Sequence, residues 1–177
     1  MNRSRIVLVA ALAIGGAMLF GLIGRADELA PGAKLPSVTV NDQDGHPVDL
    51  AAAGGKGWTL VYFYPKADTP GCTKQACSLR DAFATLTDKG VTVFGVSSDG
   101  EAAQQAFRQK YRLPFSLLAD TEKKVMDAFG VPHLGGFAKR QAFLFRDGAL
   151  VWRDLSAATD QQAADVLAAI EAGGAER

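Results

Sequence analysis

Residues 58–64, WTLVYFY, form an uninterrupted apolar and aromatic run, and Thr69-Pro70 follows a few positions later. A run of this length without polar alternation is typical of a strand that is buried on both faces of a sheet. Threonine followed by proline is typical of the N-cap and the first residue of a helix. The sequence therefore predicts a buried strand that passes directly into a helix, which is the building unit of an α/β domain.

The alternation of strands and helices continues along the chain. The helix after the first strand has apolar residues at helical spacing and is expected to end at Gly90. Residues 91–97, VTVFGVS, are the second predicted buried strand. Helices are expected at about 101–111 and, shorter, at 121–129.

The last third of the chain predicts an antiparallel hairpin and a final helix. Residues 141–155, QAFLFRDGALVWRDL, contain Asp147-Gly148, a strong signal for a two-residue hairpin turn. A capping box from Thr159 to Gln162 is expected to begin the last helix. The order β-α-β-α-(α)-β-β-α predicts an α/β protein of the thioredoxin-like fold, with a central mixed β-sheet flanked by helices.

The segment before the first buried strand predicts a linker and a small extension. Three residues, Pro31, Gly32 and Pro36, disfavour helix, so residues 27–37 are expected to be an extended linker. Residues 38–40 and 46–50 are expected to form an N-terminal β-ribbon. Residues 38–177 are thus predicted to be a single domain.

Residues 1–26 are expected to be an export segment. A short basic stretch precedes an apolar and glycine run over residues 6–24, long enough to span roughly 28 Å as a helix. Both a cleaved signal peptide and an uncleaved membrane anchor fit this pattern. Either one predicts an exported protein on the periplasmic side, with membrane contact only through residues 6–24 if the segment is uncleaved.

Charge and histidine content exclude several kinds of partner. The chain has 19 Lys and Arg against 19 Asp and Glu, and no basic cluster, so no nucleic-acid partner is expected. His46 and His133 fall in predicted loops, and their spacing from the cysteines does not match a zinc or copper site. No metal or other cofactor is expected.

Cys72 is predicted to be a reactive thiol. With Thr69 as N-cap and Pro70 as the first helical residue, Cys72 falls in the first turn, where backbone N–H groups have no partner within the helix. These donors and the helix dipole favour an anion, and therefore a thiolate. Loops at the carboxyl ends of strands in open α/β sheets are also the usual place for a functional site.

Cys77 is the only other cysteine. Residues five apart on a helix are separated by about 7.5 Å along its axis and lie on different faces. A disulfide requires Cα atoms within roughly 4.4–6.8 Å, so these two cysteines can bond only if the start of the helix unwinds. This favours a disulfide that forms and breaks during a reaction over a structural crosslink.

The stretch from Pro65 to Cys72, PKADTPGC, resembles the P-x-x-x-T-x-x-C signature of peroxiredoxins. Its continuation, TKQACSLRD, is similar to the bacterioferritin-comigratory or Q-type branch, and the resemblance extends over about residues 33–170. It implies that Cys72 is the peroxidatic nucleophile and Cys77 the resolving thiol. It also implies that Thr69 hydrogen-bonds the thiolate and the peroxide, and that Pro65 shields the pocket.

The resemblance further implies an active-site arginine from a later strand, which is best matched by Arg140 in AKRQAFLFRDG. A guanidinium there would stabilise the thiolate and polarise the peroxide. Gln141 and Ala142 stand where relatives have small hydroxyl residues, and Lys139 is the only adjacent cation.

The implied function is a thiol-dependent peroxidase that acts on hydrogen peroxide and organic hydroperoxides. Cys72 becomes a sulfenate, a transient Cys72–Cys77 disulfide follows, and a thioredoxin-like protein reduces it. Relatives of this branch suggest a monomer.

The alternative is an exported thioredoxin-like thiol-disulfide oxidoreductase, which would normally carry Cys-x-x-Cys and a cis-proline before the hairpin. A copper-delivery module on the same fold is the third possibility, and its expected cysteine spacing is absent.

Overall fold

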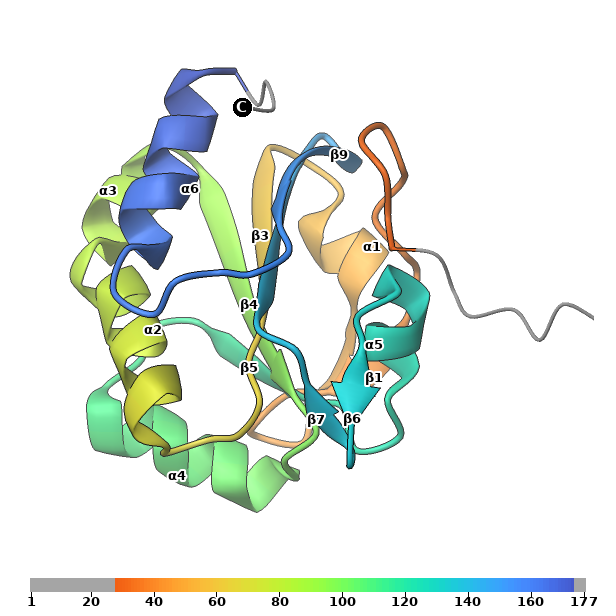
Figure 1. The fold of residues 1–177 in the computed structure, drawn as a ribbon, viewed down its shortest axis with the longest axis vertical. Coiled ribbons are helices and arrows are strands. Elements are labelled where there is room, and N and C mark those ends of the chain that lie inside the picture. Colours follow the sequence, from red (N-terminus) through yellow and green to blue (C-terminus); the bar gives the residue numbers. More distant parts are fainter. Residues whose placement is uncertain (1–27, 174–177) are drawn as a thin grey trace, which may run out of the picture.

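A five-stranded mixed sheet with helices on both faces forms the centre of the computed structural model, which describes residues 28–173 (Figure 1). The strand order is β5-β4-β3-β8-β9, in which β3, β4 and β5 are parallel and β8 and β9 are antiparallel to their neighbours. The predicted thioredoxin-like α/β architecture is therefore confirmed. The elements are β1 (Thr39–Asn41), β2 (Pro47–Asp49), α1 (Leu50–Gly54), β3 (Trp58–Phe63), α2 (Pro70–Asp81), α3 (Phe83–Asp88), β4 (Val91–Ser97), α4 (Glu101–Tyr111), β5 (Ser116–Ala119), α5 (Lys124–Phe129), β6 (His133–Leu134), β7 (Phe137–Ala138), β8 (Gln141–Arg146), β9 (Ala149–Asp154) and α6 (Gln162–Glu171).

The sheet separates two hydrophobic cores. Along β3, Leu60 and Tyr62 face one core while Val61 and Phe63 face the other, as the two-residue period of a strand requires. Helices α2, α3, α4 and α6 cover the first face, and α1 and α5 cover the second (Figure 1). This double coverage explains why β3 and β4 carry apolar residues on both faces rather than on alternate positions only.

The hairpin β8–β9 is the element that brings the far end of the sequence to the start of α2. Its turn residues Asp147 and Gly148 have φ values of 50° and 77°, the left-handed conformation of a type I′ turn. The Asp-Gly prediction is therefore confirmed. Strand β8 runs antiparallel to β3 with Gln141 opposite Phe63, so residue 140 lies beside the carboxyl end of β3.

The segment predicted as a linker is extended but packed against the edge strand β9. Backbone N–H groups of Gly32 and Leu35 donate to carbonyl oxygens of Leu150 and Gly148 at 2.7 and 2.8 Å, and Leu35 is buried. An edge strand presents unpaired backbone groups that are available for hydrogen bonding. The segment satisfies these groups, which a free linker would leave exposed.

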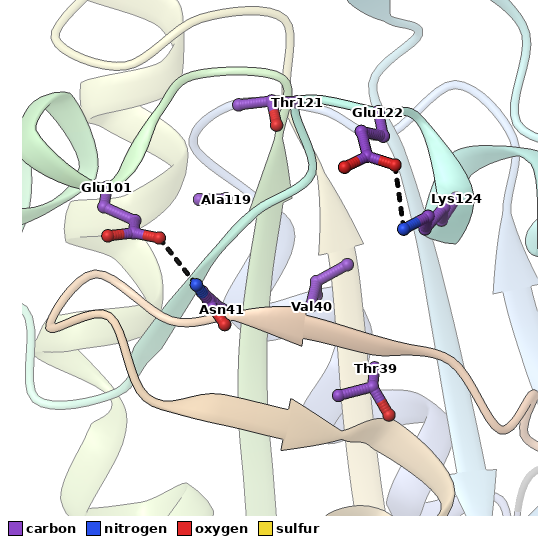
Figure 2. Close-up of a pocket in the computed structure, with 8 residues that line it drawn as sticks. All are labelled: Thr39, Val40, Asn41, Glu101, Ala119, Thr121, Glu122 and Lys124. Atoms are coloured by element: carbon purple, nitrogen blue, oxygen red, sulfur yellow. Dashed lines mark hydrogen bonds and ion pairs between the residues drawn. The ribbon is translucent and has the colours of Figure 1, made fainter.

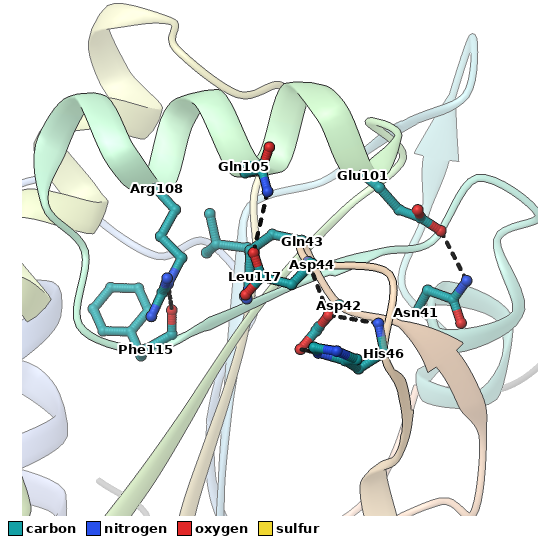
Figure 3. A network of polar contacts seen from close by, with 10 residues as sticks. All are labelled: Asn41, Asp42, Gln43, Asp44, His46, Glu101, Gln105, Arg108, Phe115 and Leu117. Atoms are coloured by element: carbon teal, nitrogen blue, oxygen red, sulfur yellow. Dashed lines mark hydrogen bonds and ion pairs between the residues drawn. The ribbon is translucent and has the colours of Figure 1, made fainter.

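The predicted N-terminal β-ribbon, β1–β2, protects the opposite edge of the sheet (Figure 3). Its loop places the buried Gln43 so that the side-chain oxygen accepts the N–H of Leu117 at 2.7 Å. The neighbouring Asp44 carboxylate accepts hydrogen bonds from Gln43 and Gln105, and these bonds hold its pKa below the ordinary value. The ribbon thus ties the edge strand β5 to helix α4.

Three possible metal ligands also meet in this loop, since atoms of Asp42, Asp44 and His46 lie within 4.8 Å of one another. The Asp42 carboxylate, however, accepts the backbone N–H groups of Asp44 and His46, each at 2.9 Å (Figure 3). The Asp42 carboxylate therefore already has a structural role, in which it stabilises the backbone turn from Asp42 to His46.

Helices α2 and α3 replace the single helix expected to end at Gly90. The chain turns at Ala82, with φ −94° and ψ 5°, and its N–H donates to Ser78 and Arg80 carbonyls. Leu79 and Leu86 lie on either side of this turn, and both are fully buried in the first core. A continuous apolar spacing therefore does not require a continuous helix.

Three other element predictions differ from the structure. Strand β5 is short and lies between two helices, and the sequence prediction omitted it, along with α1, β6 and β7. Helix α5 begins at Lys124 rather than Thr121, because the Asp120 carboxylate accepts the N–H groups of Val125 and Met126. The capping box was wrong: α6 begins at Gln162 after Gln161, with no side-chain cap.

Candidate active site

Cys72 lies in the first turn of α2, at the carboxyl end of the central strand β3. Its side chain is 2% exposed and belongs to the first core with Tyr62 and Tyr64. Thr69 is the N-cap and Pro70 the first helical residue, as the sequence predicted. The thiol is therefore buried next to backbone N–H groups that favour an anion.

Arg140 is the cation that reaches Cys72. Its Nη2 donates to Sγ of Cys72 at 3.4 Å, and its Nη1 donates to Oε1 of Gln75. The antiparallel register of β8 and β3 explains this meeting of residues that are far apart in the sequence. Gly71 leaves room for the guanidinium, because a Cβ at this position would lie 3.3 Å from Nη2.

Two glutamines extend this contact away from the thiol, and the sequence analysis missed both as site residues. Nε2 of Gln75 in α2 donates to Oε1 of Gln162 in α6 at 2.7 Å, and both side chains are fully buried. A buried polar side chain must find a partner, and neither residue lies in a spacing pattern that would reveal one. The available signal for Gln75 was its place between the two cysteines.

Cys77 lies farther along α2 and is partly exposed; both cysteines are free thiols on an intact helix. The Asp81 carboxylate and, after it, the Cys77 side chain raise the pKa of the nearby Arg80 guanidinium, which also donates to the carbonyl oxygen of Tyr111 at 3.0 Å. A shallow surface hollow at this thiol is lined by Lys74, Cys77, Ser78, Asp81, Ala82 and Asp160.

Thr69 and Pro65 lie in the loop between β3 and α2. The Thr69 hydroxyl donates to the carbonyl oxygen of Lys66 at 3.0 Å and makes no side-chain cap. Its hydrogen bond to the thiolate requires the hydroxyl to turn and stays a prediction. Pro65 borders a second surface hollow, together with the exposed side chains of Leu134 and Phe137 on the β6–β7 hairpin.

A buried network of polar side chains anchors the loop between β3 and α2. The Tyr64 hydroxyl donates to Gln104, whose Nε2 donates to Oγ of Ser97 at 2.8 Å. The Ser97 hydroxyl donates to Asp99, whose carboxylate also accepts the N–H of Ala67 at 2.7 Å. The loop that leads to Cys72 is thus fixed to the ends of β3 and β4.

The end of α4 clamps this loop from outside. The Asp68 carboxylate accepts Nζ of Lys110 at 2.7 Å and the Tyr111 hydroxyl at 2.6 Å. The hydrogen bonds from Lys110 and then Tyr111 hold the pKa of Asp68 below its ordinary value of 3.8. Asp68 has φ 59°, a conformation that asparagine also tolerates.

We expect Asp68→Asn to lower Tm slightly, on the order of 1 °C at neutral pH, because the pair is exposed to solvent. Since the folded-state pKa is depressed, the contribution of Asp68 is present above its ordinary pKa and is lost as the pH falls through the lower folded value. Thermal unfolding measured from pH 7 to pH 2 should therefore show the Tm difference closing below pH 3.8. The exposed Asp88→Asn serves as control, and a difference that persists at the lowest pH would contradict this prediction.

A separate polar hollow lies between the ribbon and the start of α5 (Figure 2). Its ionic side chains are engaged with their neighbours: Asn41 donates to Glu101 at 2.8 Å, and Lys124 lies 2.8 Å from Glu122. The hollow contains none of the five predicted site residues. The hollow at Cys77 and the hollow at Pro65, in contrast, each border a predicted site residue.

Comparisons with known proteins agree with this geometry. The family described as AhpC/TSA matches residues 31–153. Chloroplastic peroxiredoxin Q of Suaeda salsa is 40% identical over 126 residues, which are 70% of this chain and 58% of the relative. The chain thus spans somewhat more than half the length of this relative.

Solved structures match over nearly their whole length. Peroxidoxin BcpB of Mycobacterium tuberculosis has a TM-score of 0.77 and 30% identity, covering 82% of this chain and 98% of that one. The bacterioferritin comigratory protein of Xanthomonas campestris, whose structures address its alkyl peroxide reduction activity, has a TM-score of 0.73 and 26% identity, covering 82% and 99%.

The comparisons contradict the predicted location. Among the curated relatives are chloroplastic peroxiredoxin Q proteins of Suaeda salsa and Sedum lineare and the bcp protein of Coxiella burnetii, and none of these three is named as an exported protein. The prediction of an exported protein on the periplasmic side was therefore wrong. Residues 1–26, predicted as signal peptide or membrane anchor, lie outside the described residues; within residues 28–173 no helix is long and apolar enough to cross a membrane.

Proposed function

Since the chain belongs to the AhpC/TSA family, we propose that it is a thiol-dependent peroxidase that reduces hydrogen peroxide and organic hydroperoxides. The observation that carries this proposal is the Arg140 guanidinium 3.4 Å from Sγ of Cys72 at the start of α2. Positive charge and free N–H groups together stabilise a thiolate, which is the nucleophilic form of cysteine. Residues 38–177 act as one catalytic domain, in a monomer.

In the first step the Cys72 thiolate attacks the terminal oxygen of the hydroperoxide. The S–O bond forms as the O–O bond breaks, and the leaving oxygen takes a proton to become water or an alcohol. Negative charge moves from sulfur to the leaving oxygen, so Arg140 and a turned Thr69 hydroxyl stabilise the charge where it develops. Pro65 shields the reacting atoms from solvent.

In the second step α2 unwinds and Cys77 attacks the sulfur of the Cys72 sulfenic acid. A disulfide forms and water leaves. The intact helix holds the two cysteines apart, so unwinding of residues 72–77 is required before the bond forms.

A thioredoxin-like dithiol protein closes the cycle. Its thiolate attacks one sulfur of the Cys72–Cys77 disulfide, and its second thiol resolves the mixed disulfide, which returns both cysteines to the thiol form. The cycle uses protein thiols alone.

Intact-mass analysis after one equivalent of hydrogen peroxide tests the proposal. Wild type is expected to lose two hydrogen atoms within seconds, through the Cys72–Cys77 disulfide, whereas Cys77→Ser gains one oxygen atom on Cys72. The two results together identify the attacking and the resolving thiol. If both proteins stay unchanged while wild type exchanges readily with a small disulfide, the peroxidase proposal fails and a thiol-disulfide oxidoreductase takes its place.

A further inference from the structure

A chain of side-chain contacts leads from Cys72 to the first residue of α6. Cys72 accepts from Arg140, Arg140 also donates to Gln75, and Gln75 donates to Gln162 at 2.7 Å. Gln75 and Gln162 are fully buried, so water cannot replace either partner. The orientation of the guanidinium therefore depends on a side chain of the last helix.

Gln162 stands at this point because α6 uses its first turn to dock on α2. Oε1 of Gln162 accepts a hydrogen bond from Nε2 of Gln75. The N–H of the next residue, Ala163, donates to Oγ of Ser78 at 3.2 Å. These contacts lie on either side of Cys77 in the sequence. Nε2 of Gln162 is also buried and has no hydrogen-bond partner within residues 28–173.

Gln75 lies between the two cysteines, so it cannot keep its place when they bond. Unwinding of residues 72–77 pulls its amide away from both Arg140 and Gln162. Buried groups that lose a partner resist that movement. The same contacts that aim Arg140 at the thiol therefore oppose the unwinding that the disulfide needs.

We propose that Gln162 is a positioning residue that aims Arg140 through Gln75 and holds α2 folded until Cys72 has reacted. This inference rests on the proposed function, since it assigns opposite effects to two successive steps of that cycle. Loss of the Gln162 amide slows the reaction of Cys72 with peroxide and speeds formation of the Cys72–Cys77 disulfide.

Rapid-quench mass analysis of Gln162→Met provides the test. Methionine has a similar shape and removes the unpaired Nε2 together with the acceptor, so the fold is expected to persist. The second-order rate of Cys72 oxidation by hydrogen peroxide should fall about threefold to tenfold, and the first-order rate of disulfide formation should rise by a similar factor. A merely structural loosening of α2 would speed disulfide formation and leave the oxidation rate of Cys72 unchanged. Ser78→Ala is expected to show that pattern, because it removes the contact with Ala163 and leaves the amide chain to Arg140 intact.

Gln161→Met is the matched control, because Gln161 is the exposed neighbour of Gln162 and is expected to leave both rates unchanged. Gln162→Leu serves in place of Gln162→Met if circular dichroism shows that the latter is unfolded. Two rates that are unchanged, or that fall together, would overturn the inference while wild type still turns over. A wild type that forms neither sulfenate nor disulfide would overturn the proposed function and this inference with it.

Discussion

Cys72→Ser is expected to abolish peroxide consumption, with a loss of at least about 10³-fold in rate. A serine hydroxyl at the same place cannot be ionised by one guanidinium and a helix start to the extent that a thiol can, and it does not form a stable oxidised product with peroxide. The measurement is consumption of hydrogen peroxide in the presence of excess dithiothreitol, followed for wild type and variant at equal concentration.

Cys77→Ser is the matched control, because it removes a thiol of the same helix that is partly exposed and lies away from Arg140. With excess dithiothreitol it should continue to consume peroxide, since the external thiol reduces the Cys72 sulfenic acid directly. The reverse pattern, an active Cys72→Ser and an inactive Cys77→Ser, would exchange the roles of the two cysteines.

Strands β3 and β4 and the hairpin β8–β9 could be predicted because their signals are local. Strands β3 and β4 carry apolar residues on both faces as a consequence of burial on both sides, and Asp147-Gly148 has the conformation that a type I′ turn demands. The start of α2 followed in the same way from Thr69-Pro70. Each of these features depends on a few neighbouring residues, so the sequence is enough to reveal it.

The features that could not be predicted from the sequence depend on contacts between segments that are far apart in the chain. Residues 32–35 have the composition of a linker, yet they pack on β9 because its edge offers unpaired backbone groups. Gln162 was assigned to a capping box, whereas its side chain accepts from Gln75 in another helix. A local rule cannot choose between a backbone and a tertiary partner for the same amide.

The candidate site likewise combines residues that local sequence signals indicate with residues that only tertiary contacts identify. The sequence proposed Cys72 and Cys77 from their spacing and from the helix start, and Arg140 from resemblance alone, and the roles of all three stay predictions. Its contact with Cys72 follows from the register in which Gln141 lies opposite Phe63, which only the folded sheet defines. The sequence offered for Gln75 only its place between the two cysteines, and its contact with that guanidinium is defined by the fold.

Arg140→Met is expected to slow oxidation of Cys72 by about 10²- to 10³-fold, the range found when one donor to a developing charge is removed. Methionine keeps much of the volume of the side chain and loses both contacts of the guanidinium, to Sγ of Cys72 and to Gln75. Arg140→Lys should recover only part of the rate, since an ammonium cannot donate to both partners in the planar fork of arginine. The second-order rate constant with hydrogen peroxide, measured by stopped flow, checks both variants.

Lys139→Met is the control that tests the assignment of the cation. Lys139 adjoins Arg140, but it is exposed and lines the hollow at Pro65, so its loss should change the rate by less than about twofold. If Lys139→Met were slow and Arg140→Met nearly as fast as wild type, the cation that serves Cys72 would be Lys139. The 3.4 Å contact would then belong to a resting arrangement that the reaction abandons, and the amide chain to Gln162 would lose its link to the chemistry. The Arg140 pair of variants therefore decides whether the start of α6 can influence the thiol at all.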